Sequence, residues 1–261
     1  MRPIAFHLGP FPVHWFGLCI AAAFLAGMWT AVRRAPRIGV AGELIADLVV
    51  PWLLLGSVLG ARIMFVTTYW SDEFAGRPWW EVFMIQRGGL VFYGGLIGAA
   101  ITVMAFARIR KISLWQLADI LAPSIALGSV FGRIGCLMNG CCFGRACDLA
   151  WAVHFPADHA TRGVAVHPTQ IYDALLNLML YLGLAWCFRF RRKFDGQIFA
   201  IYLLGYAVTR SVVEMFRGDY PDGHLHNGLT PAHLISIGVF VTGVILFQVL
   251  RQARPQSLPA K

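Results

Sequence analysis

Residues 13–32 read VHWFGLCIAAAFLAGMWTAV, a stretch that contains no acidic residue, lysine or arginine. A helix of about 20 mostly apolar residues crosses the hydrocarbon core of a bilayer with its backbone polar groups bonded internally. The stretch therefore predicts a membrane-spanning helix. Upstream of it the chain lacks a charged n-region and a small-residue cleavage site, so we expect this helix to stay in the mature protein.

Six further stretches have the same character and contain few charged residues: 44–61, 88–107, 112–132, 170–188, 197–216 and 228–250. Of the 261 residues, 58% are hydrophobic and 13% are charged, against about 25% charged residues in soluble domains. The sequence thus predicts an all-α, polytopic membrane protein with about seven transmembrane helices. It shows no internal repeat or linker, which indicates a single domain over residues 1–261.

Lysines and arginines set the expected orientation. They gather in alternate gaps between the apolar stretches and in the tail: Arg33, Arg34, Arg37; Arg108, Arg110, Lys111; Arg189, Arg191, Arg192, Lys193; and Arg251, Arg254, Lys261. By the positive-inside rule these segments are cytoplasmic. With seven spans, the N-terminus lies outside and the C-terminus in the cytoplasm. Because the net charge of +9 is explained in this way and forms no basic stripe, no nucleic-acid partner is expected.

The remaining polar residues collect at the predicted outer helix ends, which indicates one polar site near the outer leaflet. Tyr206, Arg210 and Glu214 are spaced by four residues and share a helix face. Arg133 lies in the glycine-rich string GRIGCLMNG with no acidic residue nearby. Because the arginine fork bonds two phosphate oxygens at once, Arg62, Arg133 and Arg210 are predicted to clamp a lipid phosphate.

Several polar groups keep a structural alternative. Arg210 and Glu214 could form an ion pair that only supports the fold. Asp47, Asp119 and Asp173 each lie near a helix start, where capping or packing explains an acidic residue.

The cysteines leave more than one interpretation open. Four of them cluster in CLMNGCCFGRAC, namely Cys136, Cys141, Cys142 and Cys147. Because the outer face of a bacterial membrane is oxidising, a disulfide is one interpretation. Zinc is a weaker one, because the spacing lacks the usual C-x2-4-C pairs, and no metal is predicted.

Six strings occur in the order that is typical of the prolipoprotein diacylglyceryl transferases, and the chain resembles that family over nearly its whole length. They are HWFG at His14, GARI at Gly60, GGLVFYGGLIG at Gly88, GRIGCLMNGCCFG at Gly132, HPTQIY at His167 and LLGYAVTRSVVEMFR at Leu203. The resemblance implies transfer of the diacylglyceryl group of phosphatidylglycerol to the lipobox cysteine thiol of prolipoproteins. It implies a bacterial inner-membrane enzyme that needs no cofactor and opens its active site toward the outside.

The resemblance also assigns residues. The candidate catalytic residues are Arg133, Arg210, Tyr93 and His14, and the candidate phosphatidylglycerol-binding residues are Arg133, Arg62, Asn139, Gly144, Tyr206, Glu214 and His167. The chain departs from the family pattern at four positions: Cys136 replaces an asparagine, Cys141 a glutamate, Tyr93 a histidine and Phe16 a tyrosine. These departures leave the general base open between Tyr93 and His14.

Two other classes of function stay open at this stage. A membrane thiol-redox protein would use the cluster from Cys136 to Cys147, and a divergent phospholipid-processing transferase would use another acceptor. A transporter or channel would need polar residues along a path through the bilayer, whereas here they gather at one face.

The orientation can be tested with reporter fusions. A reporter fused after Lys261 should be cytoplasmic, and one inserted into the loop 148–161 should be outside, because the basic clusters fix the cytoplasmic side. Activity of paired cytoplasmic and periplasmic reporters at each site checks this. An external C-terminus would overturn both the orientation and a site near the outer leaflet.

Overall fold

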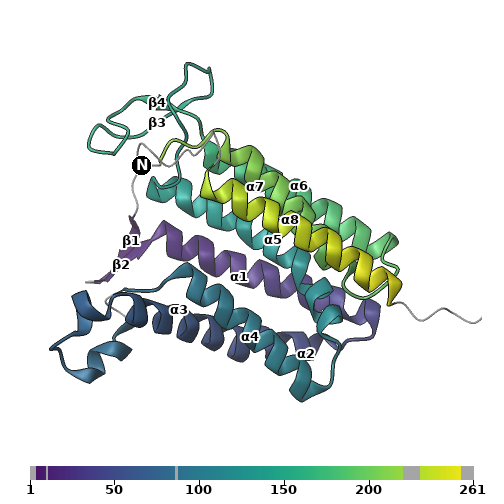
Figure 1. Cartoon of the computed structure of the whole chain (residues 1–261). Coiled ribbons are helices and arrows are strands. Elements are labelled where there is room, and N and C mark those ends of the chain that lie inside the picture. The colour runs from purple at the N-terminus through teal and green to yellow at the C-terminus, as the bar shows by residue number, and fades with distance from the viewer. Residues whose placement is uncertain (1–3, 10, 86–87, 220–229, 254–261) are drawn as a thin grey trace, which may run out of the picture. The chain divides into compact units, whose positions relative to one another are not determined.

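The structure is a computed structural model that describes residues 4–9, 11–85, 88–219 and 230–253, and most of this part is helical (Figure 1). The α-helices are α1 (Trp15–Arg34), α2 (Gly42–Asp47), α3 (Leu54–Thr68), α4 (Phe92–Arg110), α5 (Leu114–Asn139), α6 (Thr169–Phe190), α7 (Gln197–Glu214) and α8 (Pro231–Gln252). Short helical turns of other types cover Ala35–Ile38, Leu48–Leu53, Trp70–Phe74 and Trp79–Phe83.

Six helical stretches of the described chain are long and apolar enough to cross a bilayer: 15–38, 42–68, 92–110, 114–139, 169–190 and 231–252. At most 33% of the residues in each stretch are buried within the protein, which fits helices surrounded by lipid. The chain is thus a multi-pass membrane protein by the length and composition of its helices. The predicted span 197–216 is not among these six; it corresponds to the helix α7, which carries Arg210 and Glu214 near its end, so a total of seven spans stays a prediction.

The prediction of an all-α chain missed two short β-hairpins. Strand β1 (Ile4–Leu8) pairs antiparallel with β2 (Phe11–His14), and Gly9 between them adopts a φ of +60°. Strand β3 (Val153–His154) pairs with β4 (Ala165–Val166) in the connection from α5 to α6. Strands of two to five residues contain too few alternations of apolar and polar side chains to be recognised in sequence.

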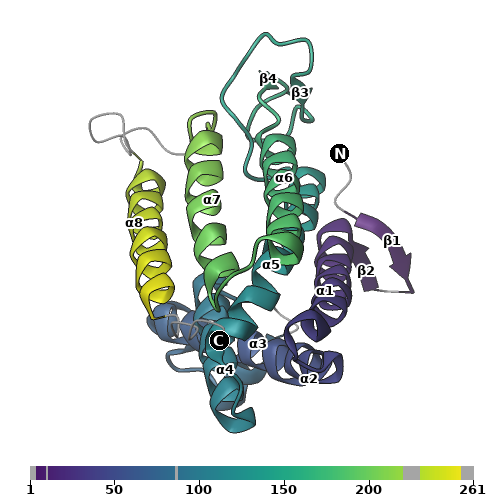
Figure 2. The same ribbon diagram turned by 90° about the vertical axis from the view of Figure 1, so that its right-hand side faces the viewer.

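The chain divides into two compact units, each described here by itself. Residues 1–31 and 118–261 form the first unit, and residues 32–117 form the second. In the first unit α7 packs against both α6 and α8, as Figures 1 and 2 show. Near the end of α1, Thr30 Oγ1 lies 3.1 Å from Ser124 Oγ of α5, which links these two helices.

Glycines bring α3 and α4 of the second unit into close contact. A Cβ atom on Gly60 would lie 2.3 Å from the carbonyl oxygen of Gly94, and one on Gly98 would lie 2.2 Å from that of Gly56. The two helices thus face each other through small-xxx-small pairs, which allow backbones to approach closely in a membrane. The sequence had placed the start of this span at Gly88. The structure starts α4 at Phe92 instead, because Gly88 and Gly89 both have positive φ, which a helix does not accept.

A buried carboxylate from α5 caps the N-terminus of α7. Asp119 of α5 is fully buried and accepts hydrogen bonds from the backbone N–H groups of Gly196, Ile198 and Phe199 at 2.8–3.0 Å. It also pairs with Arg192 at 2.9 Å. The structural interpretation of Asp119 is therefore confirmed, although the helix that it caps is α7 and not its own.

Replacement of Gly60 by alanine should destabilise the protein by about 1–3 kcal/mol, because the added methyl group meets backbone that cannot rotate away. The matched control is Gly183→Ala in α6, where a Cβ meets no described atom within 4 Å. That variant should be neutral or more stable by up to about 1 kcal/mol. Thermal unfolding of both variants in detergent measures the difference. Equal melting temperatures would contradict the close helix contact.

Candidate functional site

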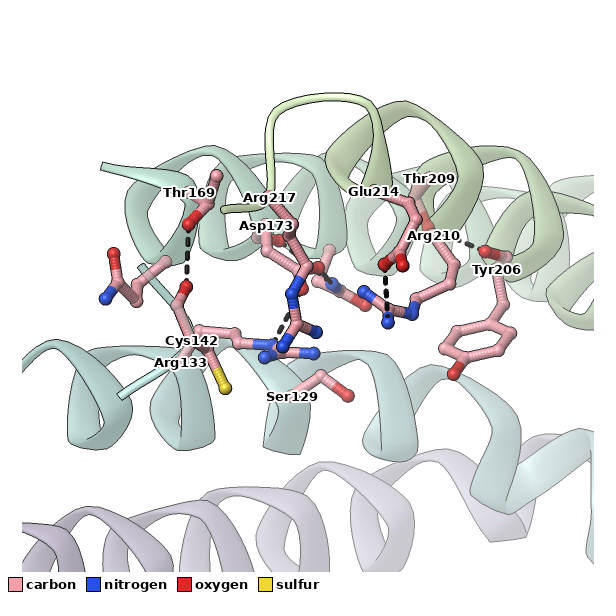
Figure 3. A network of polar contacts seen from close by, with 12 residues as sticks. Ser129, Arg133, Cys142, Thr169, Asp173, Tyr206, Thr209, Arg210, Glu214 and Arg217 are labelled. Atoms are coloured by element: carbon pink, nitrogen blue, oxygen red, sulfur yellow. Dashed lines mark hydrogen bonds and ion pairs between the residues drawn. The ribbon is translucent and has the colours of Figure 1, made fainter. Parts of the chain in front are cut away.

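Three arginines surround one carboxylate at the ends of α5, α6 and α7 in the first unit (Figure 3). Asp173, in the first turns of α6, is 4% exposed and forms an ion pair with Arg133, with 2.7 Å between Asp173 Oδ2 and Arg133 Nε. It also interacts electrostatically with Arg210 and Arg217. Ionised side chains are costly in a bilayer unless they are paired. Here the negative charge of Asp173 offsets the positive charges of the arginines around it.

Arg133 has donors that no described residue accepts. Its Nε contacts Asp173, and the structure shows no hydrogen bond from its two terminal nitrogens to a described residue. The guanidinium group is partly exposed, with 25% of the side chain accessible. The parallel N–H donors of such a guanidinium group fit the two oxygens of a phosphate or carboxylate.

Arg210 is held by a carboxylate that also joins two helices. Its Nη2 lies 2.7 Å from Glu214 Oε2, one turn further along α7. The other oxygen, Glu214 Oε1, accepts a hydrogen bond of 2.8 Å from Thr230 Oγ1. Thr230 is the N-cap of α8 and forms a capping box with His233. The predicted ion pair between Arg210 and Glu214 therefore exists, and it fixes α7 to the start of α8.

Tyr206 lies one turn before Arg210. Figure 3 shows its side chain on the same side of α7 as Arg210, as the four-residue spacing predicts. Arg217 follows α7 and makes two hydrogen bonds of 2.7 and 2.9 Å to Asp219. The network therefore contains Arg217 as well as the two arginines predicted to act.

Gly144 lies where two segments cross. Its N–H donates to His167 O at 3.0 Å, and a Cβ would lie 2.5 Å from His167 Cβ and 2.8 Å from Phe216 O. Residues 144 and 217 also form an isolated antiparallel bridge. A glycine is required here for backbone packing, which places the loop beside Arg217. This is a structural reason for Gly144, distinct from the predicted contact with lipid.

The HPTQ string fixes the cysteine-rich loop to α6. Thr169 Oγ1 donates to the carbonyl of Cys142, and Gln170 Nε2 donates to that of Cys141, both at 2.7 Å. His167 precedes them with its Nδ1 3.3 Å from the hydroxyl of Tyr172. His167 thus lies at the edge of the network, packed against aromatic side chains.

The other predicted site residues in the first unit are more peripheral. Asn139 is exposed as the last residue of α5, beside a hollow that Phe155 and His159 also line. His14 is exposed at the end of β2. Both are exposed, and the side chain of Asn139 also forms a hydrogen bond with the thiol of Cys141.

Arg62 and Tyr93 belong to the second unit. Arg62 is 9% exposed, and its guanidinium group donates to five carbonyls at 2.7–3.4 Å, those of Glu81, Val82, Met84, Gly88 and Gly89. Its donors are thus engaged in holding the connection from α3 to α4, which favours a structural role over the predicted phosphate contact. Tyr93 is 61% exposed on α4, next to the ring of Phe92.

All six cysteines of the chain lie in the described part, and each is a free thiol. The Sγ atoms of Cys136, Cys141 and Cys142 lie within 4.8 Å of one another. The pKa of Cys142 is lowered, because the thiols of Cys136 and Cys141 donate to its thiolate and the charges of Arg217 and Arg133 add to the effect. No disulfide links these residues in the structure.

Asp173 is the site residue that the sequence interpretation undervalued. Its position near a helix start suggested capping, but its partner is Arg133 on another helix. The available signal was an ionisable residue within a predicted span, which marks a functional position by default. Asn177 supports it by donating to Asp173 Oδ1 at 2.6 Å.

Membrane-length helices around a group of paired arginines and carboxylates define a multi-pass membrane protein with a polar cluster at its helix ends. Residues 3–249 match the family model described as prolipoprotein diacylglyceryl transferase. The chain belongs to this family.

Curated relatives agree with the family match. The chain is 34% identical to the phosphatidylglycerol–prolipoprotein diacylglyceryl transferase of Rhodospirillum rubrum, over 98% of the chain and 95% of the relative. It is 35% identical to the protein of that name from Gloeobacter violaceus, over 98% and 96%, and 36% identical to that from Synechococcus elongatus, over 93% and 85%. A thiol-redox protein is not favoured by these matches.

Loss of Asp173 should be costly. Asp173→Asn leaves Arg133 without its carboxylate in a mostly buried position and should lower stability by up to about 3–5 kcal/mol. The matched control is Asp47→Asn, which breaks the pair of Asp47 with Arg110, where the two side chains are 38% and 45% exposed. That change should cost no more than about 1 kcal/mol. Thermal unfolding in detergent compares the two, and equal losses would contradict the special position of Asp173.

Proposed function

We propose that the chain transfers the diacylglyceryl group of phosphatidylglycerol to the lipobox cysteine thiol of a prolipoprotein, the first step of lipoprotein maturation. The observation that carries the proposal is the group of Arg133, Arg210 and Arg217 around Asp173 in a chain of this family. The names of the relatives supply the two substrates, phosphatidylglycerol and prolipoprotein.

The arginines provide a phosphate site. The free terminal nitrogens of Arg133 bind two phosphate oxygens of the lipid, and Arg210 approaches from α7. Because Asp173 and Glu214 already hold these side chains in place, little side-chain order is lost when the lipid arrives. In the absence of lipid, the carboxylates also neutralise arginines that would otherwise be uncompensated.

In the reaction, the thiolate sulfur attacks the glyceryl carbon that bears the phosphate oxygen. A C–S thioether bond forms, the C–O bond breaks with its electron pair on oxygen, and glycerol phosphate leaves. The thiol proton passes to a base or to the departing phosphate. The positive field of several arginines has two effects. It favours the thiolate form of the substrate cysteine, and it stabilises the negative charge that develops on the leaving group.

The remaining site residues have supporting roles in this proposal. Tyr206 contacts lipid beside Arg210, Glu214 positions Arg210, and Gly144 and His167 hold the loop next to Arg217. Asn139 contacts the headgroup from the end of α5. Tyr93 and His14 stay the candidate bases, and both are exposed. Arg62 orders the connection from α3 to α4.

The proposed setting is the bacterial inner membrane, with the site open to the outside. The basic clusters at the opposite helix ends support this orientation, and the bacterial relatives support the cell type. The partners are phosphatidylglycerol, the lipobox region of prolipoprotein signal peptides and surrounding membrane lipid.

Alanine at Arg133 or Arg210 should lower the transfer rate by about 10²–10³, the usual loss when a positioned donor to developing charge is removed. Lysine should restore only part of the rate, because it keeps the charge but not the fork. Matched controls are Arg77→Ala and Arg162→Ala, which change exposed arginines in loops and should keep near-normal rates. The measurement is transfer of labelled lipid to a lipobox peptide at equal protein level.

The double variant Arg210→Ala with Glu214→Ala separates catalysis from fold support. If Arg210 serves only to neutralise Glu214, the double variant should regain activity. We expect stability to recover in part and transfer to stay low. Recovery of transfer, or near-normal rates in the single variants, would contradict a phosphate site at these arginines.

A further inference from the structure

Three thiols meet where α5 ends. Cys136 lies in the last turn of α5, and Cys141 and Cys142 follow directly after the turn at Gly140, whose φ is +78°. Their Sγ atoms all lie within 4.8 Å of one another, and each residue is partly accessible. Cys147 belongs to the same loop but not to this group. The proposed transfer reaction gives none of the three thiols a task.

The surrounding structure holds the three thiols in place. The backbone N–H of Cys141 donates to Cys136 O at 3.1 Å, which closes the loop onto the helix end. Thr169 and Gln170, each 1% exposed, bind the next two carbonyls of the loop from α6. Cys142 adopts a φ of +61°, a conformation that a residue with a Cβ keeps only where its surroundings impose it. The cluster is therefore preorganised.

The geometry and ligand type select a soft metal ion. Sulfurs bound at about 2.3 Å around one ion in a plane are about 4 Å apart, a spacing compatible with three Sγ atoms that lie within 4.8 Å of one another. Within the described residues the group contains no fourth His, Cys, Asp or Glu ligand. Zinc is almost always four-coordinate in structural sites, whereas thiolates also select copper(I).

The charges nearby also favour a monovalent ion. Three thiolates with one monovalent cation carry a net charge of −2. Arg133 and Arg217 both interact electrostatically with Cys142, and Arg133 also does so with Cys136. Figure 3 shows the carbonyl of Cys142 bonded to Thr169 close to the arginine network. Arg133 and Arg217 are already paired with Asp173 and Asp219, and their positive charges still lower the cost of a negatively charged metal–thiolate centre beside them.

We propose that Cys136, Cys141 and Cys142 form a binding site for a soft monovalent metal ion, copper(I), next to the arginine network. Occupation of the site places net negative charge beside Arg133 and so weakens the binding of lipid phosphate there. This second statement rests on the proposed transferase function, and the first does not. The site makes the enzyme sensitive to copper(I) through residues that its chemistry does not need.

Binding is tested on the full chain, purified in detergent without oxygen. Copper(I) is supplied as its coloured bicinchoninate complex, and loss of that colour reports transfer of the ion to the protein. We expect one copper(I) per chain, a thiolate-to-copper absorption band in the near ultraviolet, and three sulfur neighbours by X-ray absorption. The double variant Cys136→Ser with Cys141→Ser should lose all three signals. The control Cys147→Ser should keep them, because its thiol is outside the group.

Activity supplies the second arm. Copper(I) should slow lipid transfer by the wild-type chain roughly tenfold, the effect of one charge about 12 Å away at an effective dielectric constant of about 20. A copper(I) chelator should restore the rate. The metal-free double serine variant should retain substantial transfer and should not respond to copper(I). The rate of the metal-free wild-type chain tests the proposed function separately from metal binding.

Several outcomes would overturn the inference. Equal copper(I) binding by the double serine variant, or equal loss in Cys147→Ser, would place the ion elsewhere. Zinc that displaces copper(I) at equal free concentration would exclude a site selective for the monovalent ion. If thermal unfolding shows that the double variant does not fold, two other measurements test the site. They are copper(I) binding by Cys141→Ser alone, which should be lost, and recovery of transfer by the wild-type chain after a chelator is added. Tight binding without any change in transfer would refute the link to Arg133.

Discussion

The pairing of Asp173 with Arg133 is the interaction on which the rest of the site depends. Both side chains lie on helices that are otherwise long and apolar, where an unpaired charge is costly. The pair joins α5 to α6, and the electrostatic contact of Asp173 with Arg210 and Arg217 brings in α7 and the segment after it. Removal of this carboxylate would leave a group of like charges with no common partner.

A second requirement acts on the backbone around this pair. Residues 140–143, directly after α5, form neither helix nor strand, so their carbonyls need donors from elsewhere. Thr169 and Gln170 supply two of these donors, and Gly144 allows the loop to cross close to His167 and Phe216. These contacts hold the loop against the start of α6, beside the arginine network.

The second unit meets the same membrane constraint with different residues. Facing glycines allow α3 and α4 to approach, so that van der Waals contact replaces the hydrophobic driving force that lipid removes. Arg62 then donates to five carbonyls of the connection between these helices. An arginine that looks like a ligand-binding residue in sequence can thus be a backbone partner in the fold.

The sequence by itself determined the membrane class, the approximate helix limits and the family. Apolar runs of about 20 residues and clustered basic residues act locally, so they can be recognised without knowledge of contacts. Tyr206, Arg210 and Glu214 could be placed on one face because helical periodicity is also local. The tertiary structure alone decided that Asp173 pairs with Arg133, that Arg62 binds carbonyls, and that Cys136, Cys141 and Cys142 converge. Each of these depends on which helix ends and loops meet in space, and an arginine or a cysteine has the same appearance in sequence whether its partner is a ligand, a carbonyl or another side chain.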